Sequence, residues 1–415
     1  MKTRIVLLVL PFLILALALA SGFILLWRLF FLNALLLLFS YLWTRLGIRG
    51  ITAHVGKPAE RCQVGHWLDE EITLFNRSRL PKPFIRVQEN SNLPGHHNMT
   101  ILNLAPRSSQ SWQTRVVCQR RGRYRLGEIT ITVSDPFGLF SRHRHLGEPQ
   151  NVLIYPATPE LPFFQPLFRS EPGYGPSRWL VSESSTSAAR VREYTNSDSY
   201  NHIHWHSSAH TGKLMVKVFD PDRSTYASKD IWIILDMEQS AYPGGDGSTM
   251  TEDAVTIAAS LLKKYIDSDK QVGLITTGDQ PYLFPPQAGN QHLWQVMEAL
   301  ALVKAKGEVT LDQLIQREAE HFGTNPVIIV ITPSTTEATT SSLRRLRNRG
   351  AMVIAILLDP ASFGGTESAT STANRLIAGG LQVYVVRQGE ELSRALDTRT
   401  FSPHLRLSGE AVSSD

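Results

Sequence analysis

The chain has 415 residues, of which 42% are hydrophobic and 19% charged, and its formal net charge is +5. This composition is typical of a globular protein rather than a disordered one, and the length predicts two or three domains. Only Cys62 and Cys118 are present, which excludes a disulfide framework, and a single bridge between them would require a location outside the reducing cytoplasm. The mild positive charge suits an anionic membrane surface as well as a nucleic acid.

The first 46 residues are almost continuously apolar from Ile5 to Trp43. Such a run is long enough to cross a bilayer twice if the chain turns near its middle, so we predict a transmembrane helical hairpin over residues 1–46. Basic residues flank the run on both sides: Lys2, Arg4, Arg45 and Arg49. By the positive-inside rule, both ends and the following domains would be cytoplasmic. The alternative is a signal peptide ending at Ala20, which leaves one spanning helix and the same location.

Residues 47–156 predict an all-β sandwich domain. Short segments of alternating apolar and polar residues are separated by Gly, Pro and Asn at intervals of about ten residues, and helical periodicity is scarce. Four arginines lie close together at positions 120, 121, 123 and 125. We interpret them as a solvated strand face, because few aromatic residues accompany them, and nucleic-acid binding is the less favoured reading.

Residues 157–228 read as a connector rich in Pro, Ser and Arg, and it contains four of the thirteen histidines within nine residues. His202, His204 and His206 alternate, so in an extended segment they would share one face and, with His210, could bind a metal. With Asp198 as base, this would give a metal-dependent hydrolase. The alternative is a polar segment in which the imidazoles only donate and accept hydrogen bonds.

Residues 229–400 alternate between buried-strand and amphipathic-helix patterns, and residues 401–415 form a tail. The alternation predicts a parallel α/β sheet with helices on both faces. Ligands of such folds bind at the carboxyl ends of the strands, which here carry residues 236–240, 276–279, 310 and 332–334. This edge has no glycine-rich phosphate loop and no serine-hydrolase elbow motif.

Two stretches, 121–140 and 191–220, resemble the bacterial domain-of-unknown-function family 58. Its members show, in order, a Tyr, an Asp, an Ile-x-Trp and a Ser-Ala-x-x-Gly-x-Leu, which match Tyr194, Asp198, Ile203 with Trp205, and Ser208-Ala209 through Gly212 and Leu214. We call seven residues of this segment the signature residues, and expect them to brace the segment or to face a partner. They are Arg192, Tyr194, Asp198, His204, Trp205, Ser208 and Gly212.

The resemblance implies that the α/β domain has a Rossmann-like, von Willebrand factor A-type fold, which often binds Mg²⁺ or Mn²⁺ through an Asp-x-Ser-x-Ser turn and two further loops. Asp236 and Ser240 match that turn, Glu238 replaces its middle serine, and Thr310 matches the second loop. The third-loop acid is missing. We therefore predict a degenerate site for a hard cation at Asp236, Glu238, Ser240 and Thr310.

The resemblance also implies a function without catalysis. We expect a membrane-anchored adaptor or scaffold at the inner (plasma) membrane, which works with a MoxR-type AAA+ ATPase and a transglutaminase-like membrane protein. Its task would be assembly or maturation of a cell-envelope or enzyme complex. The alternative from a different class is the metal-dependent hydrolase built on His202 to His210.

Overall fold

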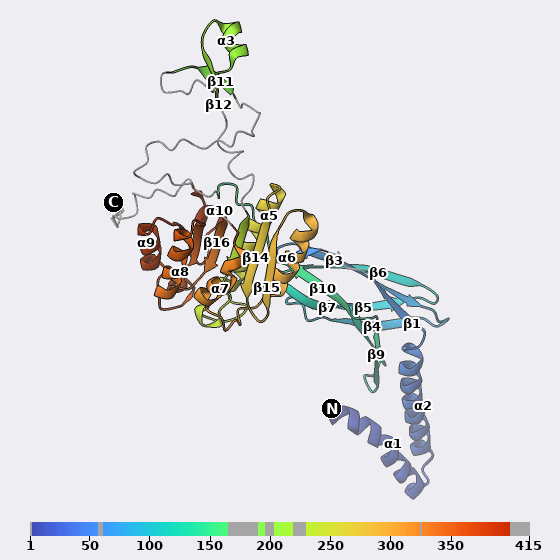
Figure 1. The fold of residues 1–415 in the computed structure, drawn as a ribbon. Coiled ribbons are helices and arrows are strands. Elements are labelled where there is room, and N and C mark those ends of the chain that lie inside the picture. Colours follow the sequence, from blue (N-terminus) through green and yellow to red (C-terminus); the bar gives the residue numbers. More distant parts are fainter. Residues whose placement is uncertain are drawn as a thin grey trace, which may run out of the picture. The chain divides into compact units, whose positions relative to one another are not determined.

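The computed structural model describes residues 2–56, 61–164, 190–195, 203–218, 230–323 and 326–398 (Figure 1). The chain forms two compact units. The first comprises Met1–Ala157 with Leu300–Leu302, and the second comprises Thr158–Ala299 and Val303–Asp415. The predicted tail 401–415 lies outside the described residues.

Two helices open the chain, α1 (Lys2–Ser21) and α2 (Ile24–Gly47), and the break between them falls at Gly22, whose φ is +67°. The left-handed conformation explains a glycine at this turn. Among the described residues, α2 is the one helix that is long and apolar enough to cross a membrane, and most of it is exposed. A signal sequence near the N-terminus would pass the same test, so the predicted hairpin is supported only as one apolar helix.

A β-rich domain follows α2, and its strands form three small sheets. The strands are β1 (Ile51–Val55), β2 (Cys62–Gln63), β3 (Trp67–Asn76), β4 (Lys82–Asn90), β5 (Met99–Leu104), β6 (Ser109–Val117), β7 (Gly122–Leu126), β8 (Glu128–Ser134), β9 (Ser141–Leu146) and β10 (Gln150–Tyr155). The sheet orders are β1-β3-β6, β5-β4-β8-β9 and β2-β10-β7. The pairs are antiparallel except β2 with β10.

The first two of these sheets share one apolar core. Ile72 of β3 lies in the same buried cluster as Ile85 and Val87 of β4, and alternate residues of both strands face inward. This is the alternation from which the strands were predicted. Strand β9 was not predicted, because five of its six residues are exposed and its sequence, SRHRHL, has no apolar face.

A small hairpin and helix occupy the described part of the connector. β11 (Arg190–Glu193) pairs antiparallel with β12 (Met215–Val218), and α3 (Trp205–Thr211) lies between them in sequence. Our expectation of an extended histidine segment is therefore wrong for residues 205–211, which are helical. His206 and His210 consequently lie one helical turn apart instead of alternating along a strand.

The α/β domain is built on a six-stranded sheet of order β15-β14-β13-β16-β17-β18 (Figure 1). Its elements are β13 (Ile231–Leu235), α5 (Thr249–Asp267), β14 (Val272–Thr277), β15 (Pro281–Gln287), α6 (Asn290–Leu302), α7 (Leu311–Glu318), β16 (Val327–Thr332), α8 (Glu337–Asn348), β17 (Met352–Leu358), α9 (Thr370–Ala378), β18 (Gln382–Val386) and α10 (Leu392–Ala395). Five strands are parallel, as predicted, whereas β15 runs antiparallel to β14 at the edge.

Both faces of this sheet are covered. Trp232 and Ile234 of β13 pack in one buried cluster with side chains of α7, α8 and α9, including Leu314, Leu343 and Leu376. Helix α5 contacts β13, β14 and β16 and presents an almost wholly buried apolar stripe. Because both faces are covered, the polar residues that follow the parallel strands are confined to the ends of the sheet, where a site was predicted.

Candidate functional site

Asp236 follows β13 directly and is 1% exposed. Its Oδ2 accepts a hydrogen bond of 2.6 Å from the Thr332 hydroxyl at the end of β16, and its Oδ1 accepts one of 3.1 Å from the Glu238 amide. Burial raises the pKa of Asp236 to about 6, and these two hydrogen bonds oppose the rise. The carboxyl therefore joins the ends of two neighbouring strands, and both of its oxygens already have a donor.

The other predicted cation ligands lie on two loops, Glu238 and Ser240 after β13 and Thr310 before α7. In the turn that follows β13, the Ser240 hydroxyl donates a hydrogen bond to the Glu238 carboxylate. Thr310 belongs to the loop before α7 and begins that helix in a capping box with Gln313. The two loops meet through backbone hydrogen bonds at Gly307, from Gly307 N to Met237 O and from Gln239 N to Gly307 O, both 2.9 Å. The metal site itself stays a prediction.

Gly307 is required where these loops meet. A Cβ atom at this position would lie 2.0 Å from Thr277 O and 2.9 Å from Met237 O, both backbone atoms. No side chain fits at such distances. The loop that carries Thr310 is therefore held against the carboxyl ends of β13 and β14 by backbone packing that only glycine permits.

Several signature residues hold α3 on its hairpin. The Ser208 hydroxyl donates to His204 O at 3.0 Å and accepts from Met215 N at 2.8 Å, which ties the helix to β12. Gly212 ends the helix in the left-handed conformation, at φ +66°. Ile203 forms a β-bridge with Val216, and both side chains are buried. These positions of the signature therefore have local structural roles.

Other signature residues leave polar and aromatic groups at the surface. Trp205 is 69% exposed, so of the two expected roles, bracing the segment or facing a partner, its exposure suits the second. The Tyr194 amide donates to Leu214 O at 2.8 Å, and its ring is half-buried. Of Arg192 the structure describes only the backbone in β11, and Asp198 lies outside the described residues, as does His202.

The described histidines of this segment do not gather into a three-ligand site. His204 Nδ1 accepts the Ser207 amide at 3.2 Å and so caps α3. The ring of His206 lies 6.2 Å from that of His204 and 5.3 Å from that of His210, between centroids. Among the described residues, however, the possible ligand atoms of these three histidines do not all come within 4.8 Å of one another, whereas zinc sites commonly use three protein ligands or more. The hydrolase hypothesis would need ligands beyond those that the structure describes.

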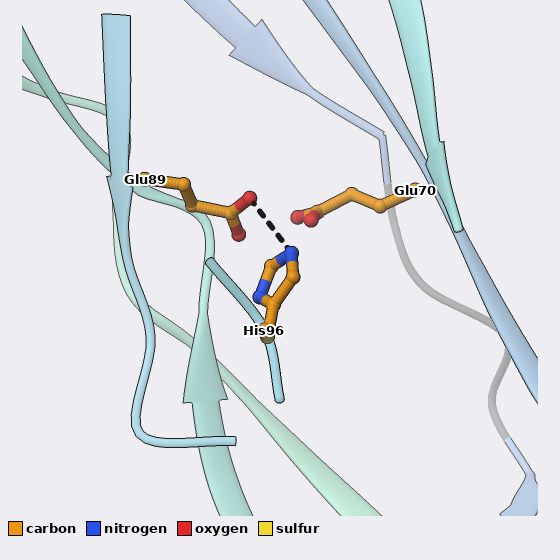
Figure 2. A group of neighbouring side chains, drawn as sticks. All are labelled: Glu70, Glu89 and His96. Carbon is orange, nitrogen blue, oxygen red and sulfur yellow. Dashed lines mark ion pairs between the residues drawn. The ribbon is translucent and has the colours of Figure 1, made fainter. Parts of the chain in front are cut away.

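A cluster that the sequence reasoning missed lies in the β-rich domain. Glu70 of β3, Glu89 of β4 and His96 of the following loop point toward one another, as Figure 2 shows. Each is 5% exposed, and one possible ligand atom from each lies within 4.8 Å of the others. Among the residues that the structure describes, this is the one such group of three or more acidic, histidine or cysteine side chains.

Taken together, the described residues define an α/β domain with a polar strand-end site, preceded by a hairpin-helix unit and a β-rich domain. Residues 190–363, which run from β11 past β17, match the family model described as "Protein of unknown function DUF58". The chain is also 25% identical over 182 residues to "Uncharacterized protein YeaD" of Bacillus subtilis (strain 168). The aligned part covers 44% of this chain and 43% of that relative, so the chain spans less than half of it.

Two solved structures illustrate distant likenesses. A CARDB domain from Pyrococcus furiosus is 17% identical and covers 25% of this chain and 94% of its own, with a TM-score of 0.21. Proximal thread matrix protein 1 from the mussel byssus is 15% identical and covers 41% of this chain and 45% of its own, with a TM-score of 0.31. Likenesses at these scores carry no conclusion about fold or function.

Proposed function

We propose that this protein is a membrane-anchored, non-enzymatic adaptor that works with a MoxR-type AAA+ ATPase in assembly or maturation of a cell-envelope or enzyme complex. The proposal assigns the anchor to α2, or to α1 and α2 together, and places the remaining domains in the cytoplasm of a bacterial cell. The α/β domain is interpreted as von Willebrand factor A-type. A transglutaminase-like membrane protein is a further expected partner.

The observation that carries the proposal is the construction of α3. Ser208 and Gly212 fix a short helix on its hairpin, yet Trp205 at its start remains 69% exposed. An exposed tryptophan on a well-tied element is costly to solvate and is a common hot spot of protein interfaces. The helix is held in place by its own hairpin and still exposes a tryptophan, and this combination favours a role in recognising a partner.

The strand-end site supports an adaptor in a second way. Asp236 uses its carboxyl oxygens to hold Thr332 and the 237–240 turn, so it is engaged in structure and poorly placed to act as a general base. Exposed groups at this edge, such as the Ser240 hydroxyl, are suited to contact another protein or to bind a cation. In the adaptor proposal this edge is a second partner-facing surface, in addition to α3.

Purification from native membranes tests the proposal. Full-length protein is cross-linked in its own cells, solubilised in detergent and compared with a tagged α1–α2 segment alone. The proposal expects a MoxR-type ATPase to be enriched with the full chain and absent with the segment. Equal recovery of the ATPase in both preparations, or in neither, would overturn the assignment of the partner.

A further inference from the structure

Glu70 and Glu89 face each other across the interior of the β-rich domain. Glu70 belongs to the inward-facing row of β3 between Leu68 and Ile72, and Glu89 continues the inward-facing row of β4 after Val87. The two strands belong to different sheets that share a core. An inward row is normally apolar, so two carboxyl groups at facing positions need a specific compensation.

Hydrogen bonds supply that compensation to only one of the two carboxyl groups. Glu89 accepts from the Gly127 amide at 3.2 Å and from Asn98 Nδ2 at 3.3 Å. Glu70 has no hydrogen-bond donor at either oxygen, although it is as deeply buried as Glu89. A buried carboxyl without donors is satisfied only if it holds a proton and shares it with an acceptor, or if it contacts a cation.

His96 completes the cluster, where its ring forms an ion pair with Glu89 but no hydrogen bond. Neither ring nitrogen makes a hydrogen bond, and Nε2 lies 3.3 Å from Glu89 Oε2. Two ligands of a tetrahedral ion, each at roughly 2.1 Å from it, lie about 3.4 Å apart. The spacing of His96 and Glu89 therefore already suits two ligands of one ion. Figure 2 shows the Glu70 carboxyl directed toward these two groups, where it could supply the third ligand.

We propose that Glu70, Glu89 and His96 form a binding site for a divalent first-row transition-metal ion, such as Zn²⁺. One imidazole disfavours Mg²⁺ and Ca²⁺, which take oxygen ligands, and two carboxylates with one imidazole suit Zn²⁺ or Mn²⁺. Gly127 and Asn98 orient Glu89 in the manner of outer-shell partners. Because its ligands come from both sheets, the ion would join them, and its role would be structural.

The matched test uses pairs of neighbours in the sequence. Glu71 follows Glu70 on β3 and His97 follows His96 in the loop, and both are exposed. The full chain in detergent, freed of metal with a chelator, is titrated with ZnCl₂ by calorimetry. We expect one saturable site that Glu70→Gln and His96→Gln weaken at least tenfold, whereas Glu71→Gln and His97→Gln leave it unchanged. Unchanged binding in the first two variants, or no saturable binding to wild type, would overturn the site.

Two further readouts locate the ion without relying on variants. X-ray absorption of the wild-type zinc complex is expected to show only nitrogen and oxygen ligands at about 2.0–2.1 Å. Sulfur in the shell would move the ion to Cys62 and Cys118 and contradict the proposal. Loss of the site in the double variant His206→Ala/His210→Ala would place it on α3 instead. Binding of zinc is independent of any ATPase, so failure of this site leaves the adaptor proposal standing.

Zinc should also protect the strands that supply its ligands. Hydrogen exchange of β3 and β4 in the wild-type chain is expected to slow by about 100-fold when free zinc is 100 times its Kd, since the ion binds only the folded state. The same exchange measured without metal shows whether Glu70→Gln and His96→Gln are folded. Zinc that binds without slowing exchange in either strand would contradict a site between the sheets.

Discussion

Replacing Glu70 by glutamine should stabilise the metal-free β-rich domain, and increasingly so as the pH rises. Burial, together with the neighbouring negative charge of Glu89, raises the pKa of Glu70 from 4.5 to about 8. The folded state thus holds a proton that the unfolded state releases above pH 4.5. Stability from this group is present at low pH and is lost progressively between pH 4.5 and 8.

The magnitude follows from the shift. At 1.36 kcal/mol per pH unit, wild type loses roughly 3 kcal/mol between pH 5 and 8, and the neutral glutamine avoids this loss. Glutamine has nearly the same shape and can donate to Glu89 as a protonated Glu70 would. The variant should therefore match wild type within about 1 kcal/mol at pH 5 and exceed it by about 3 kcal/mol at pH 8.

Hydrogen exchange of β3 and β4 peptides, in the full chain with chelator, measures the local free energy of opening. Wild type and variant are compared at the same pH, so the intrinsic exchange rates cancel. The neighbouring Glu71→Gln, on the exposed side of β3, should show no pH-dependent gain. A difference between Glu70→Gln and wild type that is equal at pH 5 and pH 8, or a destabilised variant at pH 8, would refute the reasoning.

Three further predictions concern packing and redox chemistry. Thr332→Val should destabilise the α/β domain by about 1–3 kcal/mol in thermal unfolding, because it removes a donor to buried Asp236; an unchanged melting temperature would contradict this. Gly307→Ala should lower the free energy of unfolding of the α/β domain by about 1–3 kcal/mol or more, and should speed hydrogen exchange at the ends of β13 and β14. Cys62 and Cys118 are free, buried and 2.8 Å apart at sulfur, so a mild oxidant should join them and differential alkylation should detect the bridge. Two thiols that stay separately alkylated after oxidation and unfolding would contradict that geometry.

Much of the fold could be predicted because apolar residues recur along the sequence with the period of the strand or helix whose face they bury. The run from Asp230 to Met237 and its successors predicted the parallel strands, and the structure has them. Strand β15 was not predicted, because Pro281, Pro285 and Pro286 argue against a central strand. An edge strand, in contrast, tolerates proline. Its place at the edge depends on tertiary pairing, which local sequence does not encode.

The clusters of side chains were harder to foresee. The alternating histidines suggested an extended segment, while Gly212, placed to end a helix, was the better indication for residues 205–211. Glu70 and Glu89 did carry a signal, since Glu70 stands between the inward-facing Leu68 and Ile72, and Glu89 follows the inward-facing Val87. His96 carried none, because its approach to the two carboxyl groups is fixed by the loop after β4 and by the packing of two sheets.

The adaptor proposal is tested most directly at Trp205, with Trp67 as the matched control. Both side chains are exposed, at 69% and 60%, but Trp67 lies on β3 of the β-rich domain. Trp205→Ala should reduce recovery of the MoxR-type ATPase from native membranes at least tenfold, since an interface tryptophan typically contributes 2 kcal/mol or more, whereas Trp67→Ala should leave recovery unchanged. Equal recovery with both variants and wild type would contradict the account.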